Sequence, residues 1–334
     1  MRILISTSPF GATGREPLEL LENSGHDLLH NPYGRRLRAG EVAELIQDVD
    51  AVVAGTEPYD AETLRSSTRL KVISRVGIGL DSVDLDLCRR HGISVTYTPD
   101  APSDGVAELA VANILALLRH IPQSDRSVRE GAWNRLMGRL VREVTIGIVG
   151  VGRIGSRVIR LLSSFSARVL ATDTDKRVYG MELPNTTWCD LDALLRSSDL
   201  ISLHIPMAVA NRHFLSRARI ARMRTGAYVV NTSRGAVLDE EALADGLRQG
   251  HLGGAALDVF EREPYEGPLC RMDNVILTAH IAASARQSRY LMELGAAQDC
   301  LRVLAGQEPA NDALAAAALS RSTQDRTKSW SQEL

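Results

Sequence analysis

The 334-residue sequence contains few cysteines and few aromatic residues. Its four cysteines, Cys88, Cys189, Cys270 and Cys300, are far apart and form no Cys-x-x-Cys pair, which argues against a zinc site and against a disulfide framework. We interpret all four as small buried hydrophobic residues of a protein from a reducing cytoplasm. Because aromatic residues make up only 4% of the chain, the core should be aliphatic.

Long apolar runs and an excess of basic charge are also absent from the sequence. No run reaches the roughly 18 apolar residues that a membrane span requires, and Met1–Ser6 is typical of a strand rather than of a signal peptide. The formal net charge of −2 argues against a protein that binds by neutralising nucleic-acid phosphates. We therefore expect a cytoplasmic protein with no membrane and no nucleic-acid partner.

Short apolar, β-branched segments alternate with helical patterns along most of the chain, as is typical of parallel sheets. A chain of 334 residues also exceeds what one core usually fills, so two domains are expected. The predicted strands are Ile3–Ser6, Ala51–Ala54, Val72–Val76, Thr145–Gly150, Val169–Asp173, Leu200–Ile205, Tyr228–Ser233, Ala255–Phe260 and Val275–His280.

Two long helical patterns indicate how the domains are connected. Asp104–Arg119 is predicted to lead into the second domain, and Gln287–Leu304 is predicted to carry the chain back to the first. The expected organisation is a discontinuous substrate domain (residues 1–100 plus 286–312), a cofactor domain (residues 101–285) and a flexible tail (residues 313–334).

The strongest local motif is Gly150-x-Gly152-x-x-Gly155, which directly follows an apolar strand and precedes a helical pattern. Gly150 is expected to form the tight turn, Gly152 to let the backbone approach a pyrophosphate, and Gly155 to allow close packing of helix on strand. The next strand ends in Asp173, a suitable ligand for ribose hydroxyls that would repel a 2′-phosphate, so NAD is predicted rather than NADP. The alternative is a strand-helix turn with a purely structural role.

Several of the later predicted strands end in side chains that could perform chemistry. Ligands of such sheets bind beyond the carboxyl ends of the strands, and alcohol oxidation needs a base together with a cation for the substrate carboxylate. Arg234, Glu263 and His280 supply these groups. A structural role is about as common for any single strand-end histidine, and His204 is the rival to His280. No residues have convincing metal-ligand spacing, so no metal is expected.

The sequence resembles the D-isomer-specific 2-hydroxyacid dehydrogenases, in particular the phosphoglycerate dehydrogenase-like branch, from the start of the chain to about Gly306. The motifs that carry the resemblance are Val76-Gly-Ile-Gly-Leu-Asp81, Val106-Ala-Glu-Leu109, Gly150–Gly155, His204-Ile-Pro206, Asn231-Thr-Ser-Arg-Gly235, Leu257-Asp-Val-Phe-Glu261 with Glu263-Pro264, and Thr278-Ala-His-Ile281. The resemblance implies two doubly wound parallel-sheet α/β domains, a Rossmann-type cofactor domain and a flavodoxin-like substrate domain, with an active-site cleft between them. It also favours a homodimer.

The resemblance also implies roles for individual residues. Arg234 would hold the substrate carboxylate and carbonyl, His280 would be the acid/base, and Glu263 would pair with His280. The cofactor would be lined by Gly150, Gly152, Arg153, Ile154, Gly155, Asp173, His204, Pro206, Thr232, Ser233 and Asp258. The substrate carboxylate would be gripped by the backbone of Val76, Gly77, Ile78 and Gly79. Ala279 stands where the family usually has proline, a change expected to loosen the placement of His280.

Two alternatives concern the function itself. The C-terminal-binding-protein corepressors resemble this family and retain the same triad, so a dinucleotide-sensing binding protein is the rival to an NAD-dependent dehydrogenase. Within the dehydrogenases, Arg75 and Arg135 could bind a second anionic group, such as a phosphate or phosphonate on a small 2-hydroxy or 2-keto acid. Both could equally be surface arginines without such a role.

Overall fold

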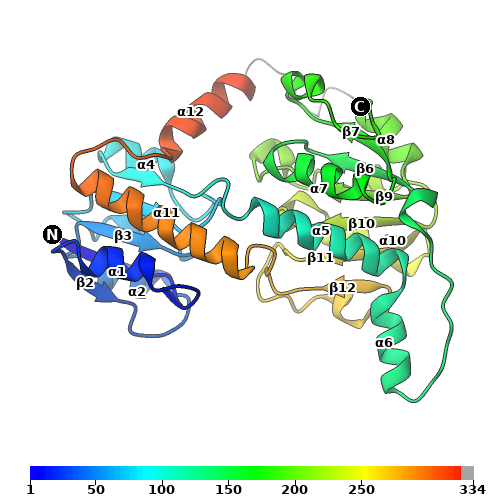
Figure 1. Ribbon diagram of the computed structural model, residues 1–334, viewed down its shortest axis with the longest axis horizontal. Helices are drawn as coiled ribbons and strands as arrows, with labels where there is room; N and C mark the ends of the chain where they lie inside the picture. The colour runs from blue at the N-terminus through cyan, green and yellow to red at the C-terminus, as the bar shows by residue number, and fades with distance from the viewer. Residues whose placement is uncertain (325–334) are drawn as a thin grey trace. The chain divides into compact units, whose positions relative to one another are not determined.

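The computed structural model describes residues 1–324 of the chain, which form two compact units (Figure 1). Unit 1 contains Met1–Pro102 and residues 283–324, and unit 2 contains Ser103–Ala282. No single helix among the described residues is long and apolar enough to cross a membrane, and one bent pair of helices passes such a test by length and composition alone.

Unit 1 is built on a five-stranded sheet in which every observed pairing is parallel. Its spatial order is β2-β1-β3-β4-β5, so the chain changes its direction of winding between β1 and β3. The strands are β1 (Arg2–Ile5), β2 (Asp27–His30), β3 (Ala51–Ala54), β4 (Val72–Arg75) and β5 (Ser94–Thr96).

Helices cover both faces of this sheet, because successive residues of a strand point to opposite sides. Ile3 and Ile5 pack in one core cluster with residues of α1 and α11, whereas Leu4 packs in another cluster with residues of α2, α3 and α4. The helices of unit 1 are α1 (Glu16–Glu22), α2 (Ala39–Leu45), α3 (Ala61–Leu64), α4 (Leu85–Arg90), α11 (Arg286–Leu304) and α12 (Ala313–Gln324). The long helix α11 thus completes the unit that the N-terminal segment begins.

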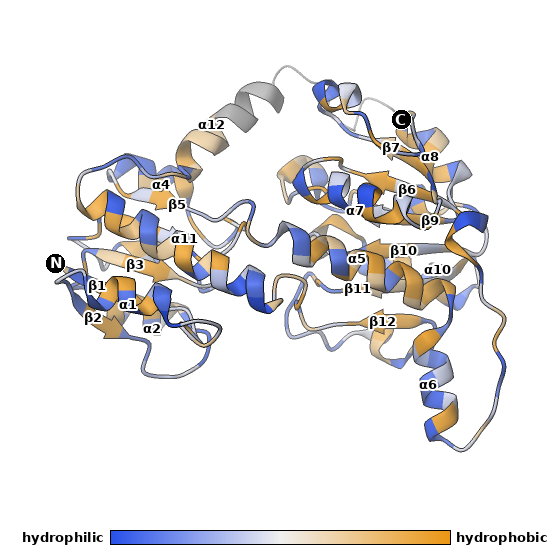
Figure 2. Ribbon diagram, viewed as in Figure 1, coloured by the Kyte–Doolittle hydropathy of each residue, from blue (hydrophilic) through white to orange (hydrophobic). Residues whose placement is uncertain are grey.

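Unit 2 is built on a seven-stranded parallel sheet of order β12-β11-β10-β9-β6-β7-β8, and its direction of winding changes between β6 and β9. The strands are β6 (Thr145–Val149), β7 (Arg168–Thr172), β8 (Thr186–Trp188), β9 (Leu200–Leu203), β10 (Ala227–Asn231), β11 (Leu252–Leu257) and β12 (Val275–Leu277). Buried aliphatic residues dominate these strands, as the hydropathy colours show (Figure 2).

The helices of unit 2 also form a layer on each face of its sheet. One core cluster joins α5 and α7 to the sheet, and the other joins α8, α9 and α10 to the opposite face. The α-helices are α5 (Ser103–Leu118), α6 (Ile121–Arg129), α7 (Arg153–Ser163), α8 (Leu191–Ser197), α9 (Arg217–Ile220) and α10 (Glu240–Arg248). Short 3₁₀ helices are η1 (Val141–Glu143), η2 (Lys176–Gly180), η3 (Val209–Asn211), η4 (Gly235–Val237) and η5 (Pro268–Arg271).

The structure corrects three expectations. The strands β2, β5 and β8 were not predicted, because two of them have only three residues and β2 begins and ends in a polar residue.

The tail predicted from residue 313 is wrong for its first part, since Ala313–Gln324 form α12 and Ala313 is fully buried. Residues 325–334 lie outside the described part. The expectation that all four cysteines are buried is wrong for two of them, since Cys270 is exposed and Cys189 is only partly buried.

Candidate active site

The glycine motif forms the turn between β6 and α7, next to the point where the winding of the sheet changes. Gly150 has φ +88°, and a Cβ there would lie 2.7 Å from the carbonyl oxygen of His204. A Cβ on Gly155 would lie 2.0 Å from the carbonyl oxygen of Gly150, so α7 packs directly on the turn. At Gly152, the N-cap of α7, a Cβ would meet nothing within 4 Å. This open space at a helix N-terminus suits an anionic pyrophosphate.

Asp173 follows β7 and lies against the glycine turn. Its Oδ2 accepts a hydrogen bond from the backbone N–H of Val151 (2.7 Å), and its Oδ1 accepts one from the N–H of Asp175 (2.8 Å). The neighbouring cations are engaged elsewhere, since Arg177 binds Asp175 and Lys176 donates to Tyr179. The carboxylate therefore stands beside the dinucleotide turn, where its negative charge would repel a 2′-phosphate.

His204 directly follows β9 (Leu200–Leu203), on the other side of the same switch point. Its Nε2 lies 2.9 Å from Ser202 Oγ, while its buried Nδ1 has no hydrogen-bond partner among the described residues. Burial lowers the pKa of this imidazole to about 4, so the ring is neutral near pH 7. Thr232 Oγ1, after β10, is a second buried polar atom without a partner in the described residues. Two such atoms at the carboxyl ends of the strands fit a site that receives a polar ligand.

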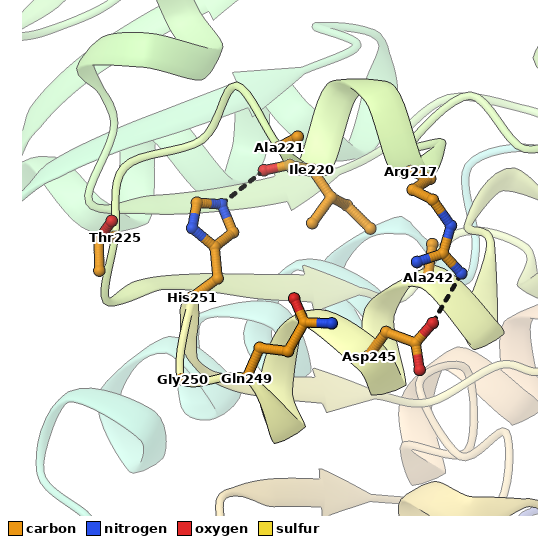
Figure 3. Close-up of a pocket in the computed structure, with 10 residues that line it drawn as sticks. Arg217, Ile220, Ala221, Thr225, Ala242, Asp245, Gln249, Gly250 and His251 are labelled. Atoms are coloured by element: carbon orange, nitrogen blue, oxygen red, sulfur yellow. Dashed lines mark hydrogen bonds and ion pairs between the residues drawn. The ribbon is translucent and has the colours of Figure 1, made fainter.

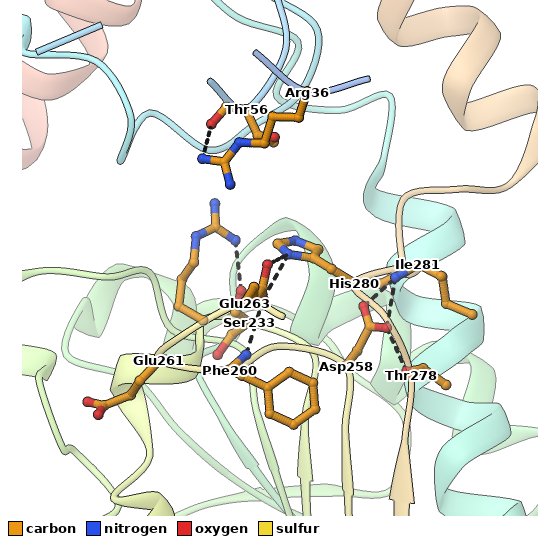
Figure 4. Close-up of polar contacts among 12 residues, drawn as sticks. Arg36, Thr56, Ser233, Asp258, Phe260, Glu261, Glu263, Thr278, His280 and Ile281 are labelled. Atoms are coloured by element: carbon orange, nitrogen blue, oxygen red, sulfur yellow. Dashed lines mark hydrogen bonds and ion pairs between the residues drawn. The ribbon is translucent and has the colours of Figure 1, made fainter. Parts of the chain in front are cut away.

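His280 and Glu263 are paired at the carboxyl ends of β12 and β11 (Figure 4). His280 Nδ1 lies 3.1 and 3.0 Å from the two carboxylate oxygens, and Glu263 Oε1 also accepts from the N–H of Phe260. Partial burial opposes ionisation of Glu263, but the hydrogen bond and charge of His280 outweigh it, and the pKa of the carboxyl group is lowered. The carboxylate is thus charged and holds the Nδ1 side of the ring, which leaves Nε2 for another partner.

Asp258 fixes the backbone on both sides of His280. This carboxylate is fully buried and accepts hydrogen bonds from Thr278 Oγ1 (2.6 Å) and from the N–H groups of Ile281 (2.8 Å) and Ala282 (2.9 Å). The N–H of His280 donates to the carbonyl of Asp258, and His280 has φ +53°, in the left-handed region that such residues rarely occupy. These bonds define the position of His280 although proline is replaced by Ala279.

Arg234 follows β10, the neighbour of β11 in the sheet. Its Nη1 donates to the carbonyl of Ser233 (2.7 Å), and the Asn231 side chain bonds the backbone of both residues. A Cβ on Gly235 would lie 1.8 Å from the carbonyl carbon of Phe260, so the segments after β10 and β11 are in direct contact. The charge of Arg234 also contributes to the lowered pKa of Glu263. The structure therefore brings Arg234, Glu263 and His280 together at adjacent strand ends.

The expected carboxylate loop of unit 1 follows β4. Gly77 has φ +140°, and its N–H donates to Thr98 Oγ1 (2.8 Å) while its carbonyl accepts from the N–H of Thr98 (3.0 Å). Arg75 is buried beneath this loop, where its Nη1 donates to the carbonyl of Val76 (2.7 Å). Arg75 is thus part of the interior of unit 1 and is not a surface arginine.

Arg135 is not brought together with the other candidate residues of unit 2. It is exposed in the irregular segment after α6, and α6 itself binds Asp273, at the amino end of β12. A surface pocket near the amino ends of β10 and β11 also lies apart from the candidate site (Figure 3). Two of its polar side chains are paired locally, Arg217 with Asp245 and His251 with the carbonyl of Ile220. Among the described residues, no group of three or more His, Cys, Asp or Glu could hold a metal ion.

Two residues that support the site were not singled out from the sequence. Ser202 holds His204, and Asn231 organises the backbone at Arg234. The available signal was a polar residue inside an otherwise apolar strand, since both are fully buried. Such a residue is a candidate for holding a neighbouring loop, because buried polar groups require hydrogen-bond partners.

Together, the doubly wound sheet, the glycine turn with its neighbouring carboxylate, and the Arg-Glu-His cluster define a dinucleotide-dependent oxidoreductase. Residues 111–282 match the family described as D-isomer specific 2-hydroxyacid dehydrogenase, NAD binding domain. The chain belongs to this family and is an NAD-dependent D-2-hydroxyacid dehydrogenase.

Relatives with known names act on several different acids. The chain is 40% identical to a glyoxylate reductase of Thermofilum pendens over 280 residues, which cover 80% of this chain and 82% of that protein. It is 36% identical to a D-3-phosphoglycerate dehydrogenase of Archaeoglobus fulgidus over 271 residues, 79% of this chain and 51% of that protein. A D-lactate dehydrogenase of Aquifex aeolicus, solved with NAD and lactic acid, superposes with a TM-score of 0.83 at 27% identity, covering 94% of this chain and 99% of that one.

Proposed function

We propose that the protein reduces a small 2-keto acid to the D-2-hydroxy acid, or catalyses the reverse reaction, by hydride transfer at C2. The observation that carries this proposal is the hydrogen-bonded pair of His280 and Glu263 beside Arg234, at three adjacent strand ends of the dinucleotide-binding unit. These groups match the chemical needs of the reaction, which are a proton donor for the alkoxide oxygen and a cation for the carboxylate.

The cofactor would lie along the carboxyl ends of the strands of unit 2. Gly152 has the open space for the pyrophosphate, and Asp173 would bind the ribose hydroxyls. The unpaired atoms of His204 and Thr232 offer polar contacts nearby. Bound NAD supplies or accepts the hydride. The remaining proposed lining residues are Gly150, Arg153, Ile154, Gly155, Pro206, Ser233 and Asp258, although the carboxylate of Asp258 is already engaged by the His280 segment.

His280 would move the proton. In the direction of reduction, protonated Nε2 donates to the carbonyl oxygen of the substrate, and in oxidation the neutral nitrogen removes the hydroxyl proton. Glu263 stabilises the protonated ring and fixes its orientation through Nδ1. The guanidinium of Arg234 would bind the carboxylate and polarise the carbonyl, which a planar group with several donors does well.

The substrate carboxylate would bind the backbone of Val76, Gly77, Ile78 and Gly79. The left-handed Gly77 keeps this loop folded back on Thr98, so that the chain after β4 turns sharply at the strand end. The names of the relatives leave two substrate classes, small monoanionic acids such as glyoxylate and hydroxypyruvate, and phosphorylated acids.

The test is consumption of NADH by the purified protein with a panel of glyoxylate, hydroxypyruvate, pyruvate and 3-phosphohydroxypyruvate. Turnover of at least one acid, with a D-configured product where C2 becomes chiral, is expected. NADH binding without turnover of any 2-keto acid would instead support the dinucleotide-sensing binding protein.

The protein would act as a homodimer through an apolar arm formed by residues 121–140, which comprises α6 and the irregular segment after it. The arm exposes Trp133 (77%) and Met137 (91%) together with Ile121, Val128 and Leu136. Large apolar residues concentrated in one exposed segment are typical of a protein interface. A second copy is the proposed partner because dimers with two-fold symmetry are the commonest oligomers of soluble proteins.

A further inference from the structure

A buried polar network lies at the carboxyl ends of β1 and β3 in unit 1. Its centre is Glu57, a carboxylate that is only 1% exposed. Glu57 Oε1 accepts hydrogen bonds from Ser6 Oγ, from the N–H of Gly55 (2.7 Å) and from the hydroxyl of Tyr59 (3.1 Å). Three donors on one oxygen are typical of a carboxylate in its charged form.

The network occupies the switch point of the five-stranded sheet. Ser6 follows β1, and Gly55 and Glu57 follow β3, and the winding of the chain changes between these two strands. A Cβ on Gly55 would lie 2.6 Å from Glu57 Oε2, so the carboxylate fills the space above the end of β3. Switch points are where sheets of this type bind ligands, so the negative charge stands at the expected ligand edge of unit 1.

The network also reaches the loop that is proposed to grip the substrate carboxylate. The N–H of Val76, the first residue of this loop, donates to the carbonyl of Ala54 (2.9 Å), next to Gly55, whose own N–H donates to Glu57. The guanidinium of Arg75 in turn lies beside Gly77, where a Cβ would be 3.3 Å from Nη1. Glu57 and Tyr59, which follow β3, and Arg75 and Gly77, at the end of β4, therefore form a group at two adjacent strand ends of unit 1.

The buried charges of this group affect the binding of ligands with more than one anionic group at the loop. Arg75 contributes one buried positive charge and Glu57 one buried negative charge, so the two cancel and this pair offers no surplus cation to an anionic group, whereas the substrate carboxylate would have Arg234 as its cation. Buried charges are poorly screened by salt, and at several ångströms a like charge in protein surroundings opposes binding appreciably. Arg36, whose Nη2 donates to the carbonyl of Thr56 (2.7 Å; Figure 4), is exposed and therefore screened by solvent.

We propose that Glu57 makes the enzyme selective for 2-keto acids with a single negative charge and discriminates against phosphorylated acids. This inference rests on the proposed function and deepens it. Specificity of this kind arises from repulsion of the wrong substrate rather than from added contacts with the right one. Glu57 does not contact the reacting atoms. Its role is to determine specificity through its charge.

The test compares kcat/KM for hydroxypyruvate with kcat/KM for 3-phosphohydroxypyruvate, two acids that differ by one phosphate group. The wild type should prefer hydroxypyruvate. In Glu57→Gln, which retains an acceptor oxygen without the charge, the ratio should shift toward the phosphorylated acid by about tenfold, mainly through its KM. The matched control is Tyr59→Phe, which removes a hydrogen bond of the same network and keeps the charge, and its ratio should remain that of the wild type.

The ratio is independent of how much folded enzyme each preparation contains, so a loss of stability does not obscure it. An unchanged ratio in Glu57→Gln, an equal shift in Tyr59→Phe, or a wild type that prefers the phosphorylated acid would each overturn the selective role of Glu57 while leaving the proposed dehydrogenase function intact. Failure of the wild type to turn over any 2-keto acid would overturn the proposed function and the inference with it.

Discussion

His280 and His204 both lie at strand ends of the same sheet, yet only His280 has a carboxylate partner. Positioned acid/base catalysis contributes about 10²- to 10⁴-fold, so His280→Ala should lose turnover on that scale. NADH binding should persist, because the dinucleotide turn is formed by other residues. Steady-state kinetics and NADH fluorescence titration measure the two effects.

His204→Ala is the matched comparison for the same assay. Because its imidazole is neutral near pH 7, this residue cannot supply a proton there, and its loss should weaken NADH binding more than it slows chemistry. Wild-type turnover in His280→Ala, combined with lost turnover in His204→Ala, would show that the two roles are reversed.

The pKa of His204 also predicts how stability depends on pH. The folded pKa of about 4 lies below the ordinary 6.5, so the unfolded chain binds a proton that the folded protein does not over this interval. Stability is therefore fully present above pH 6.5 and declines as the pH falls toward 4, by up to about 3 kcal/mol. In His204→Gln the thermal midpoint should fall less over this range than in the wild type. His30→Gln, at an exposed site, should retain the wild-type profile.

We expect that activity requires the planar guanidinium of Arg234 and not only its positive charge. Arg234→Lys retains a cation but cannot form two parallel hydrogen bonds to a carboxylate and carbonyl. We expect kcat/KM to fall at least about 100-fold, a loss of roughly 3 kcal/mol of transition-state stabilisation. Near-normal steady-state constants for this variant would remove Arg234 from the proposed site.

At the scale of elements, two glycines of the turn between β6 and α7 have different roles. Gly155 allows α7 to pack on the turn, and Gly152 leaves space for a ligand. A Cβ on Gly155 would clash with the carbonyl of Gly150, so Gly155→Ala should lower both the thermal midpoint and the affinity for NADH. A Cβ on Gly152 would meet nothing within 4 Å, so Gly152→Ala should fold normally and lose only affinity for NADH. Differential scanning calorimetry and NADH titration distinguish the two variants. Equal NADH affinity in Gly152→Ala and the wild type would contradict the proposed path of the pyrophosphate.

The elements that sequence could predict are those with a strong local signal. All nine expected strands are present within a few residues of their predicted bounds, and α11 returns to unit 1 as expected. The cluster of Arg234, Glu263 and His280 could also be anticipated, because parallel strands place their carboxyl ends at one edge. The network around Glu57 could not be anticipated from the sequence. It depends on the segments after β1 and β3 and on the end of β4, and these meet only because of the order of the strands in the sheet.

At the scale of the whole molecule, the apolar arm predicts the oligomeric state. Trp133→Ser combined with Met137→Ser should weaken the proposed homodimer, because about 1 to 3 kcal/mol is lost for each large apolar side chain removed from an interface. Sedimentation equilibrium should show a dissociation constant raised at least about tenfold. Val209→Ser is the control, since Val209 is 96% exposed but lies outside the arm. A wild type that remains monomeric at high concentration would contradict the dimer.

The return of α11 to unit 1 has a consequence for how the chain is synthesised. Ile3, Val53 and Val72 share a core cluster with Met292, Ala296 and Cys300 of α11, so one face of the first sheet is covered only in part, by α1, until residue 304 has been made. Unit 2 is continuous and can acquire its native structure earlier. On the ribosome, the usual order in which an N-terminal domain folds first should therefore be reversed, and nascent chains that stop before residue 286 should expose an apolar surface that chaperones recognise.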